Sequence, residues 1–388
     1  MTELRSTTTG SALRRLFLDV HALQTLPPAN VNRDDSGSPK QALYGGIRRA
    51  RVSSQAWKRA TRLYLAERQD RETSATRTKR LASLVAAALA ARTGLEKEAA
   101  LRVCAAVVRA SGIKMADKRP DQTSYLIFLG RGQVDAIAAA IAPHAASLAA
   151  LADKELDKAA GDIDIKPLLE QGHPLEVLLF GRMVADLADI NVDATAQVAH
   201  AISTHAVDTE YDYYTAVDDE NPAEDSGAGM IGTVEFNSAT FYRYATLAVH
   251  ALAEALPDAD AAAEAARRFV EAFALSMPTG HQNAFAHRTR PDLVLAVLRG
   301  DQPVNLVTAF EEPVTSREGI VRLSMARLAA ELDRAGRMWS DRPLLVVCSR
   351  PADGSPDLEP AFGPPLAFDD LLGQVAVAVA AHLEARPR

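Results

Sequence analysis

The chain has only two cysteines, Cys104 and Cys348, among its 388 residues. Two isolated cysteines supply neither the spacing of a zinc site nor a disulfide framework, so a disulfide-stapled or zinc-ribbon protein is excluded and a reducing compartment is expected. The sequence also lacks a secretory signal and any apolar run of about 18 residues. We therefore expect a cytoplasmic protein that has no membrane partner.

Aromatic residues are scarce as well. They make up 5% of the chain, whereas hydrophobic residues make up 48% and charged residues 24%. Such a composition is typical of a globular protein and excludes fibrous and disordered chains. A chain of this length can bury a substantial core and is expected to contain more than one compact unit.

Signatures of catalysis are missing. The sequence has no Walker A loop, no HExxH, no GxSxG and no CxxC. Its histidines are scattered: His200 and His205 would not share a helix face, and His281 and His287 are interpreted as structural histidines. We expect a binding protein rather than an enzyme, with no catalytic residues, cofactor or metal.

The overall charge hides a local excess of cations. The formal net charge is −7, yet residues 33–62 hold eight Lys and Arg against only Asp34 and Asp35. The basic residues are Arg33, Lys40, Arg48, Arg49, Arg51, Lys58, Arg59 and Arg62. Such a concentration is the footprint of a polyanion site, although a solvated charged face is the alternative. The two aspartates could hold a metal, but no third ligand lies nearby, so turn capping is favoured.

The stretch from Gly45 to Arg62 is expected to organise this basic region. A glycine pair suits positive φ or a close backbone approach, residues 47–53 alternate like a strand, and Ser53 or Ser54 can cap a helix that follows. On that helix Gln55, Lys58, Arg59 and Arg62 form one polar stripe, whereas Trp57, Ala60 and Tyr64 face inward. Cations beside a helix start can bind phosphate.

The middle of the chain, from about residue 63 to 190, is rich in alanine and helical periodicity. We expect helices at 81–92, 96–110, 134–151 with a break at Pro143, and 173–188. The last contains Met183, which helical spacing alone assigns to the core. A helical unit inside a chain that begins with a strand, at residues 13–23, suits an insertion into a mixed core.

Residues 207–217 and 231–236 are rich in strand formers and enclose a turn-rich acidic loop, which predicts a protruding β-hairpin. Tyr213 and Tyr214 would point to opposite faces of its first strand, so at least one is expected to be exposed. An exposed tyrosine can stack on a base.

In the last third of the chain, expected helices alternate with expected strands. Helices are expected at 239–256, 260–276, 317–335 and 368–383, and strands at 291–298 and 344–348. This alternation indicates an α+β sheet layer of the ferredoxin-like or RNA-recognition kind.

Motifs spread along the chain resemble one family. Asn32-Arg33-Asp34-Asp35 is followed by Gly45-Gly46 and by Ser53-Ser54-Gln55-x-x-Lys58-Arg59, and further matching runs lie at 200–208, 215–219, 232–236 and 241–245. In this order they are similar to the CasC family, the repeated backbone subunit of the type I-E CRISPR Cascade surveillance complex. The likeness covers most of the chain and is weakest in the helical insertion and after about residue 335.

The resemblance implies a hand-like fold with an RNA-recognition-like palm, a helical fingers insertion and a β-hairpin thumb. The expected segments are 12–62 for the first part of the palm, 63–190 for the fingers, 191–206 for the palm connection, 207–236 for the thumb and 237–388 for the second part of the palm. The implied partners are guide crRNA, the target DNA strand, other Cascade subunits and further copies of the chain in a head-to-tail filament.

The resemblance also implies a set of RNA contacts. Arg33, Lys40, Ser53, Gln55, Lys58 and Arg62 would hold the guide backbone, and the basic region adds Arg49, Arg51 and Arg59. Met183 would be a wedge against a base, which reverses its assignment to the core. Tyr213, Tyr214 and Thr215 would enter the guide at a displaced nucleotide. A subunit that accepts any spacer sequence requires such backbone-directed contacts.

Two other functions stay open. One is an RNA-processing endoribonuclease of a CRISPR system, which would need a histidine or a Lys/Tyr set at the scissile phosphate, and no such set can be assembled from the sequence. The other is a metabolic enzyme whose basic helix binds a phosphorylated small molecule. The local excess of cations and the motifs together favour the non-catalytic, guide-binding subunit.

Overall fold

The computed structural model describes residues 15–216, 230–352 and 356–385. The expected leader at 1–11, the first residues of the palm segment that begins at 12, and the acidic loop between the hairpin strands lie outside the described residues. The chain divides into two compact units. Residues 1–61 with 197–388 form the first, which we call the sheet unit, and residues 62–196 form the second, which we call the helical unit.

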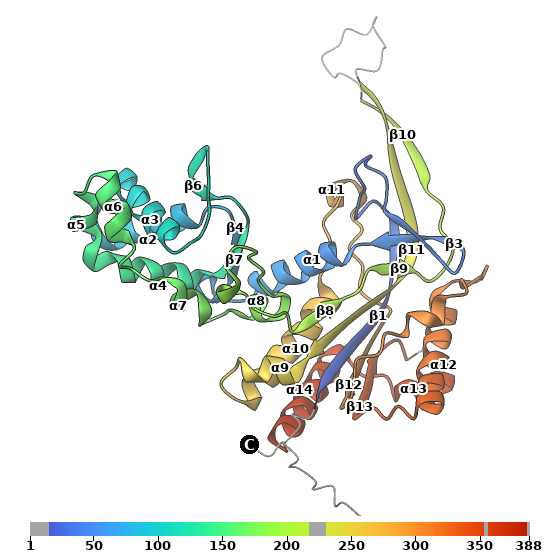
Figure 1. The fold of residues 1–388 in the computed structure, drawn as a ribbon. Helices are drawn as coiled ribbons and strands as arrows, with labels where there is room; N and C mark the ends of the chain where they lie inside the picture. Colours follow the sequence, from blue (N-terminus) through green and yellow to red (C-terminus); the bar gives the residue numbers. More distant parts are fainter. Residues whose placement is uncertain (1–14, 217–229, 353–355, 386–388) are drawn as a thin grey trace, which may run out of the picture. The chain divides into compact units, whose positions relative to one another are not determined.

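The sheet unit is built on an antiparallel sheet with the strand order β13-β12-β1-β11-β9-β3-β2 (Figure 1). The strands are β1 (Phe17–Ala29), β2 (Gln41–Tyr44), β3 (Ile47–Val52), β9 (Ala201–Ser203), β11 (Met230–Ala248), β12 (Leu293–Arg299) and β13 (Leu345–Ser349), with β8 (Ala196–Val198) beside β11. Because β1 pairs antiparallel with both β11 and β12, these two run parallel to each other. Helices lie between these two strands in the chain.

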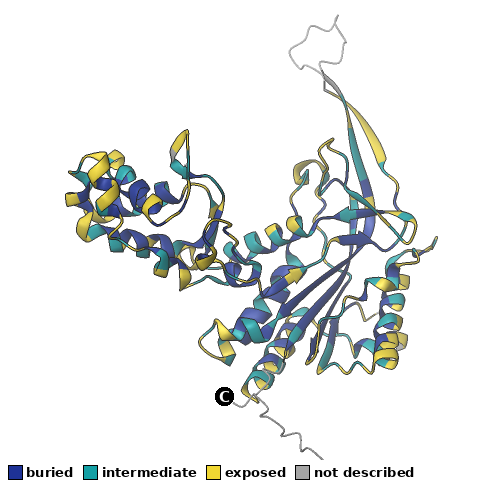
Figure 2. Cartoon of the chain, in the orientation of Figure 1, coloured by how far each residue is buried: buried dark blue, intermediate teal, exposed yellow. Residues whose placement is uncertain are grey.

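Helices cover both faces of this sheet, which makes β12 buried along its whole length (Figure 2). On one face, Leu295 and Val297 pack with Leu328 of α12 (Val321–Trp339). On the other face, α10 (Ala259–Leu275) and α14 (Phe368–Glu384) pack together against the central strands. The remaining short elements are α9 (Val249–Glu254), α11 (Gln282–Phe285), η4 (Leu306–Phe310), η5 (Pro356–Leu358) and α13 (Glu359–Phe362). The predicted α+β class is confirmed.

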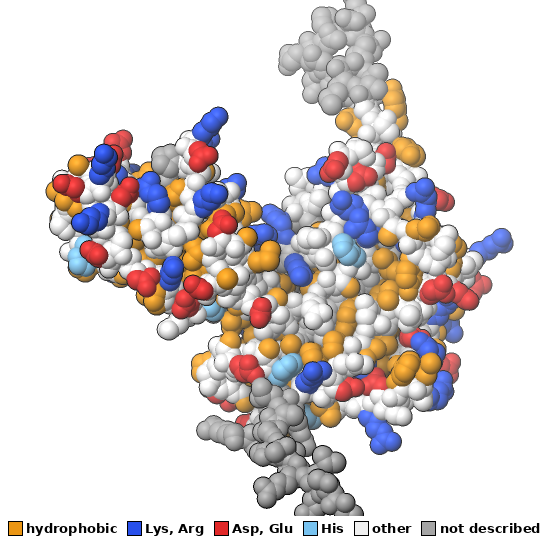
Figure 3. All heavy atoms as spheres, in the orientation of Figure 1, with side chains coloured by type: hydrophobic (Ala, Val, Ile, Leu, Met, Phe, Trp, Pro, Cys, Tyr) orange, Lys and Arg blue, Asp and Glu red, His pale blue; other side chains and the backbone are white. Residues whose placement is uncertain are grey.

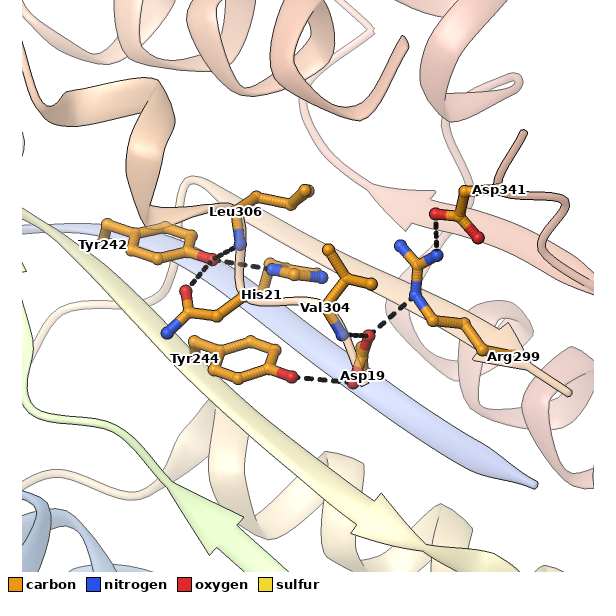
Figure 4. Close-up of polar contacts among 9 residues, drawn as sticks. Asp19, His21, Tyr242, Tyr244, Arg299, Val304, Leu306 and Asp341 are labelled. Carbon is orange, nitrogen blue, oxygen red and sulfur yellow. Dashed lines mark hydrogen bonds and ion pairs between the residues drawn. The ribbon is translucent and has the colours of Figure 1, made fainter. Parts of the chain in front are cut away.

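Buried polar side chains tie the loop after β12 to the central strands (Figure 4). Asp19 Oδ2 accepts hydrogen bonds from Arg299 Nε at 2.8 Å and from Val304 N at 2.9 Å, and Tyr244 Oη donates to Asp19 Oδ1 at 2.9 Å. Arg299 also donates to Asp341. Burial raises the pKa of Asp19, against the opposing effect of these partners. A charge inside a sheet core is tolerated because it is paired.

A second set of buried hydrogen bonds, centred on Tyr242, lies beside the contacts of Asp19. Tyr242 Oη lies 2.8 Å from His21 Nδ1, accepts from Leu306 N at 3.1 Å and donates to Asn305 Oδ1 at 3.1 Å. Burial, and then the charge of Arg299, lowers the pKa of His21 to about 3, so the imidazole is neutral. These contacts hold the loop in place and give the group a structural role.

The helical unit has a core of its own, to which Leu89, Val107 and Ile137 belong. Its helices are α2 (Leu81–Thr93), α3 (Lys97–Ala110), α4 (Arg131–Ile141), α5 (Ala145–Ala149), α6 (Asp153–Ala160), α7 (Lys166–Glu170) and α8 (Leu175–Phe180), with 3-10 turns η1 (Arg71–Thr73), η2 (Ala142–His144) and η3 (Ala188–Ile190). Two small sheets pair β4 (Ala75–Thr78) with β7 (Ile127–Gly130) and β5 (Met115–Ala116) with β6 (Arg119–Thr123). In the described residues no helix is long and apolar enough to cross a membrane.

Two expected elements are wrong. The helix expected at 239–256 is strand as far as Ala248. Residues 239–247 of β11 are buried on both faces, so they lack the alternation that marks a strand in a sequence. The helix expected at 173–188 ends at Phe180, where Gly181 takes a φ of 73°. The strand expected at 13–23 continues through Pro27 and Pro28 to Ala29, and its register shifts between Leu26 and Ala29.

Candidate nucleic-acid interface

The basic helix forms where the sequence predicts it. Helix α1 (Ser54–Ala66) follows β3 directly, and Ser53 Oγ accepts a hydrogen bond from Ala56 N at 3.3 Å, which caps the helix start. Trp57 is 1% exposed and packs in a cluster with Phe241 of β11. The apolar face of α1 is thereby fixed to the sheet, and the opposite face is open.

The polar stripe of α1 lies on that open face. Gln55 and Arg59 are exposed and Lys58 is partly exposed. Among the described residues no carboxylate lies within ion-pair distance of Lys58 or Arg59. Both cations are therefore available to an external anion. Arg62 begins the helical unit, where its guanidinium carbon lies 5.3 Å from the ring centroid of Phe128.

The glycine pair before β3 meets both of its predicted requirements. Gly45 and Gly46 have φ values of 58° and 74°. A Cβ on Gly45 would lie 1.8 Å from the carbonyl oxygen of Glu311, whereas a Cβ on Gly46 would meet nothing within 4 Å. The close approach at Gly45 seats the turn between β2 and β3 on the loop that follows η4.

Arg49 does not belong to the interface, and the prediction for this residue is wrong. Its side chain is 0% exposed, Nη1 donates to Ser203 O at 3.0 Å and Nη2 donates to Phe310 O at 2.9 Å. Burial lowers the pKa of this guanidinium. The alternation of β3 points Arg49 inward, where it joins neighbouring segments through their carbonyl groups. Ser53, only 8% exposed, supports the helix start, and its contact with a nucleic-acid backbone stays a prediction.

Arg51 pairs with His200, a histidine distant in the sequence that lies near the first residue of α1. Its Nη1 lies 3.1 Å from His200 Nδ1, and its Nε donates to Gln41 O at 3.1 Å. Burial, and then the nearby Arg51, lowers the pKa of His200, so the pair carries the single charge of Arg51. Sequence reasoning missed His200, because only the pairing of β3 with β9 places its neighbourhood beside Arg51.

The loop before β2 carries Arg33 and Lys40. Asp34 Oδ1 accepts hydrogen bonds from Ser36 N at 2.9 Å and from Ser38 N at 3.0 Å, so the predicted turn capping is confirmed. The bond from the Ser36 hydroxyl is the main cause that lowers the pKa of Asp34. Arg33 is exposed and Lys40 is partly exposed. Within the described ranges, no group of three or more His, Cys, Asp and Glu could hold a metal.

The hairpin is an extension of the central sheet. The second half of β11 pairs with β1, and its first half, Phe236 to Met230, pairs with β10 (Glu210–Ala216). Tyr213 is 64% exposed and Tyr214 is 38% exposed, which confirms that at least one tyrosine faces solvent. Thr215 is exposed as well. The hairpin thus offers aromatic rings from a strand that the sheet core holds in place.

Met183, in the helical unit, is 85% exposed, so its assignment to the core from helical spacing is wrong. It follows Arg182, whose Nε donates to Ile190 O at 2.6 Å and whose Nη2 donates to Leu169 O at 2.6 Å. A Cβ on Gly181 would lie 2.8 Å from Val192 O. These contacts fix the backbone of residues 181–182, and the side chain of Met183 extends into solvent.

Figure 3 shows Lys and Arg side chains, with a histidine beside them, on the face of the sheet unit toward the hairpin. Within residues 33–59, the exposed or partly exposed cations of this unit are Arg33, Lys40, Arg48, Arg51, Lys58 and Arg59. Guanidinium and ammonium groups beside exposed aromatic rings are the combination that binds single-stranded nucleic acid.

Comparison with solved structures gives two matches over nearly the whole chain. One, described as "CRISPR RNA-guided surveillance complex, pre-nicking", has a TM-score of 0.81 and 33% identity and covers 94% of this chain and 100% of the matched chain. Another, described as "CRISPR RNA-guided surveillance complex", has a TM-score of 0.71 and 31% identity and covers 92% and 99% of the two chains. No match was found among curated proteins.

These matches confirm the predicted resemblance to a CRISPR family. The model of the CT1975-like protein family matches residues 18–362, which include every described residue of the candidate interface. The chain belongs to the CT1975-like protein family.

Proposed function

We propose that this protein is a non-catalytic backbone subunit of a type I-E CRISPR surveillance complex, and that it binds the guide crRNA along its phosphate backbone. The observation that carries the proposal is the open cationic face of α1, with Lys58 and Arg59 free of carboxylate partners in the described chain, within a fold that matches surveillance-complex chains over their full length.

Backbone contacts suit this task because a guide subunit must accept any spacer sequence. Arg33, Lys40, Arg51, Gln55, Lys58, Arg59 and Arg62 supply cationic and amide groups for phosphates. Tyr213, Tyr214 and Thr215 of the hairpin, together with Met183, supply the surfaces that separate one base from the next. Short guide segments between displaced nucleotides then stay open for pairing with a target DNA strand.

Copies of the chain would assemble head to tail on the guide with other Cascade subunits. A head-to-tail contact uses two different surfaces, so it does not close and produces a filament whose length the RNA sets. The net charge of −7 is compatible with this role, because residues 33–62 carry a local excess of cations and the negative balance lies in the rest of the chain.

The test is to purify the chain together with its partner subunits and to measure the nucleic acid that accompanies it. The proposal predicts a single guide RNA species of defined length that ribonuclease removes. Incubation with repeat RNA is expected to leave that RNA intact. Specific cleavage by the chain alone would instead support the endoribonuclease alternative.

A further inference from the structure

A groove lies between the hairpin and the segment 279–285, and this segment takes no part in the contacts described above. Its volume is about 640 Å³, within the range of small-ligand sites. It is lined on one side by Asp212, Tyr214 and Val234 of the hairpin, and on the other by the segment 279–285, which includes α11. The sequence contains no motif that points to it.

The segment that forms the far wall is held in a demanding conformation. His281 and Ala286, which flank α11, have φ values of 49° and 47°, a region that non-glycine residues rarely adopt. A Cβ on Gly280 would lie 2.4 Å from the carbonyl oxygen of Val31. The buried His287 Nε2 lies 2.9 Å from Pro278 O. Residues in such a strained conformation persist only where the surrounding structure holds them, and they cluster at functional sites.

The groups presented are flat rings and amides. The ring of Phe285 lies nearly parallel to the imidazole of His281, with centroids 6.2 Å apart and 9° between the planes. Phe236 packs against Phe285 at 6.0 Å. Gln282 and Asn283 are exposed in the groove and offer amide donors and acceptors. Rings bind the face of any base, and amides bind its edge.

Charge is distributed unevenly along the groove. Arg33 Nη1 lies 2.6 Å from His281 Nε2, so an exposed guanidinium borders the loop side. Burial, and then Arg33, lowers the pKa of His281, which leaves the guanidinium as the charged member of the pair. Asp212 lies on the hairpin side and repels phosphate there. A nucleotide would therefore place its phosphate toward Arg33 and its base toward the hairpin.

We propose that this groove binds one unpaired nucleotide of single-stranded RNA, with the base between Phe285 and Tyr214 and the phosphate at Arg33. The proposal rests on the proposed function that the chain binds guide RNA. It adds the segment 279–285 to the base contacts that the hairpin and Met183 are proposed to make.

The first experiment is a double-mutant cycle on the full chain with a 12-nucleotide single-stranded RNA and the same RNA made abasic. Wild type is expected to bind the abasic strand at least about tenfold more weakly, because the groove and the hairpin both lose a stacked base. Phe285→Ala is expected to bind normal RNA about tenfold more weakly than wild type does. On the abasic strand the variant and wild type are expected to have the same affinity. Phe285→Tyr, which keeps a ring, is expected to retain wild-type binding.

The matched control is Tyr211→Ala, which removes an exposed tyrosine of the same hairpin that does not line the groove. It is expected to keep the full tenfold discrimination against the abasic strand. Additive losses for Phe285→Ala and the abasic strand would overturn the groove assignment while leaving RNA binding itself intact. Absence of any RNA binding by wild type would instead reject the proposed function.

A second experiment needs no variant, so a folding defect cannot obscure it. RNA containing 4-thiouridine is cross-linked to the wild-type chain, and the modified peptides are mapped by mass spectrometry. Cross-links in the segments 211–216 and 279–286 support the proposal. Cross-links confined to α1 and the loop at 31–40 overturn it.

Discussion

The guanidinium carbon of Arg243 lies 3.7 Å from the ring centroid of Trp57, and both side chains are 1% exposed. Trp57 belongs to the basic helix α1, and Arg243 belongs to β11, the strand that also forms half of the hairpin. Arg243 Nη1 donates to Gln24 Oε1 at 2.5 Å and to Ala274 O at 3.3 Å. One buried cation therefore joins the start of α1 to the strand that carries the hairpin.

Replacement of this cation is expected to unfold part of the sheet unit. Arg243→Met fills much of the volume but leaves the buried acceptors of Gln24 and Ala274 without donors and removes the stack on Trp57. The expected loss in the free energy of unfolding is about 3 kcal/mol. Urea denaturation followed by tryptophan fluorescence measures it. A loss below about 1 kcal/mol would mean that the contact contributes little.

The two glycines of the β2–β3 turn are expected to differ in their tolerance of a methyl group. Gly45→Ala adds a left-handed alanine and a clash with Glu311 O, and should cost about 2–4 kcal/mol. Gly46→Ala has open space and should cost about 1–2 kcal/mol for the conformation alone. Chemical denaturation of both variants checks the order. Equal costs would show that the close approach is not maintained in solution.

Stability is expected to fall as the pH drops below the ordinary pKa of histidine. Because the folded-state pKa of His21 is lowered from 6.5 to about 3, the unfolded chain binds a proton that the folded chain excludes as the pH falls from 6.5 toward 3. This group alone should cost about 2 kcal/mol between pH 6.5 and pH 5. The stability of wild type minus that of His21→Gln, measured over this range, isolates the contribution. A constant difference would contradict it.

Exposed residues of the proposed base contacts are expected to affect RNA binding and not folding. Tyr213→Ala and Met183→Ala remove side chains that are 64% and 85% exposed, so the melting temperature should stay within about 1–2 °C of wild type. Affinity for guide RNA should fall by about 1–3 kcal/mol for the tyrosine, the usual range for one stacked base. Fluorescence anisotropy with labelled RNA measures this. Unchanged affinity for both variants would remove them from the interface.

Local patterns predicted part of this architecture well. The glycine pair, β3 and the capped helix α1 all depend on contacts between near neighbours, and each was expected from the residues of 45–62 alone. The break at Pro143 followed from the lack of a backbone donor. Elements whose conformation is decided by local chemistry are the ones that a single sequence reveals.

Long-range packing decided what the sequence could not reveal. Arg49 and Arg51 share one face of β3. Only the distant Phe310 O and Ser203 O bury the first, whereas the second lies beside His200. The strand from 239 to 248 reads as a helix because both of its faces are buried. The groove at His281 joins segments that are about 45 to 70 residues apart, so local spacing in the sequence does not predict it.

The central claim is that the open face of α1 binds the RNA backbone, and it is tested most directly by the salt dependence of RNA affinity. Lys58→Glu with Arg59→Glu reverses two exposed cations of this face, and Lys97→Glu with Lys154→Glu makes the same change of charge at exposed first-turn positions of α3 and α6. Glutamate is favourable in a first turn, so the control pair should fold normally.

Gel-shift titrations with RNAs of unrelated sequence, from about 50 to 200 mM salt, provide the measurement. The α1 pair is expected to weaken binding at least about 100-fold on every RNA and to reduce the slope of log affinity against log salt by about two, because two phosphate contacts are lost. The control pair is expected to stay close to wild type in both quantities. Wild-type affinity and slope in the α1 pair would contradict the account.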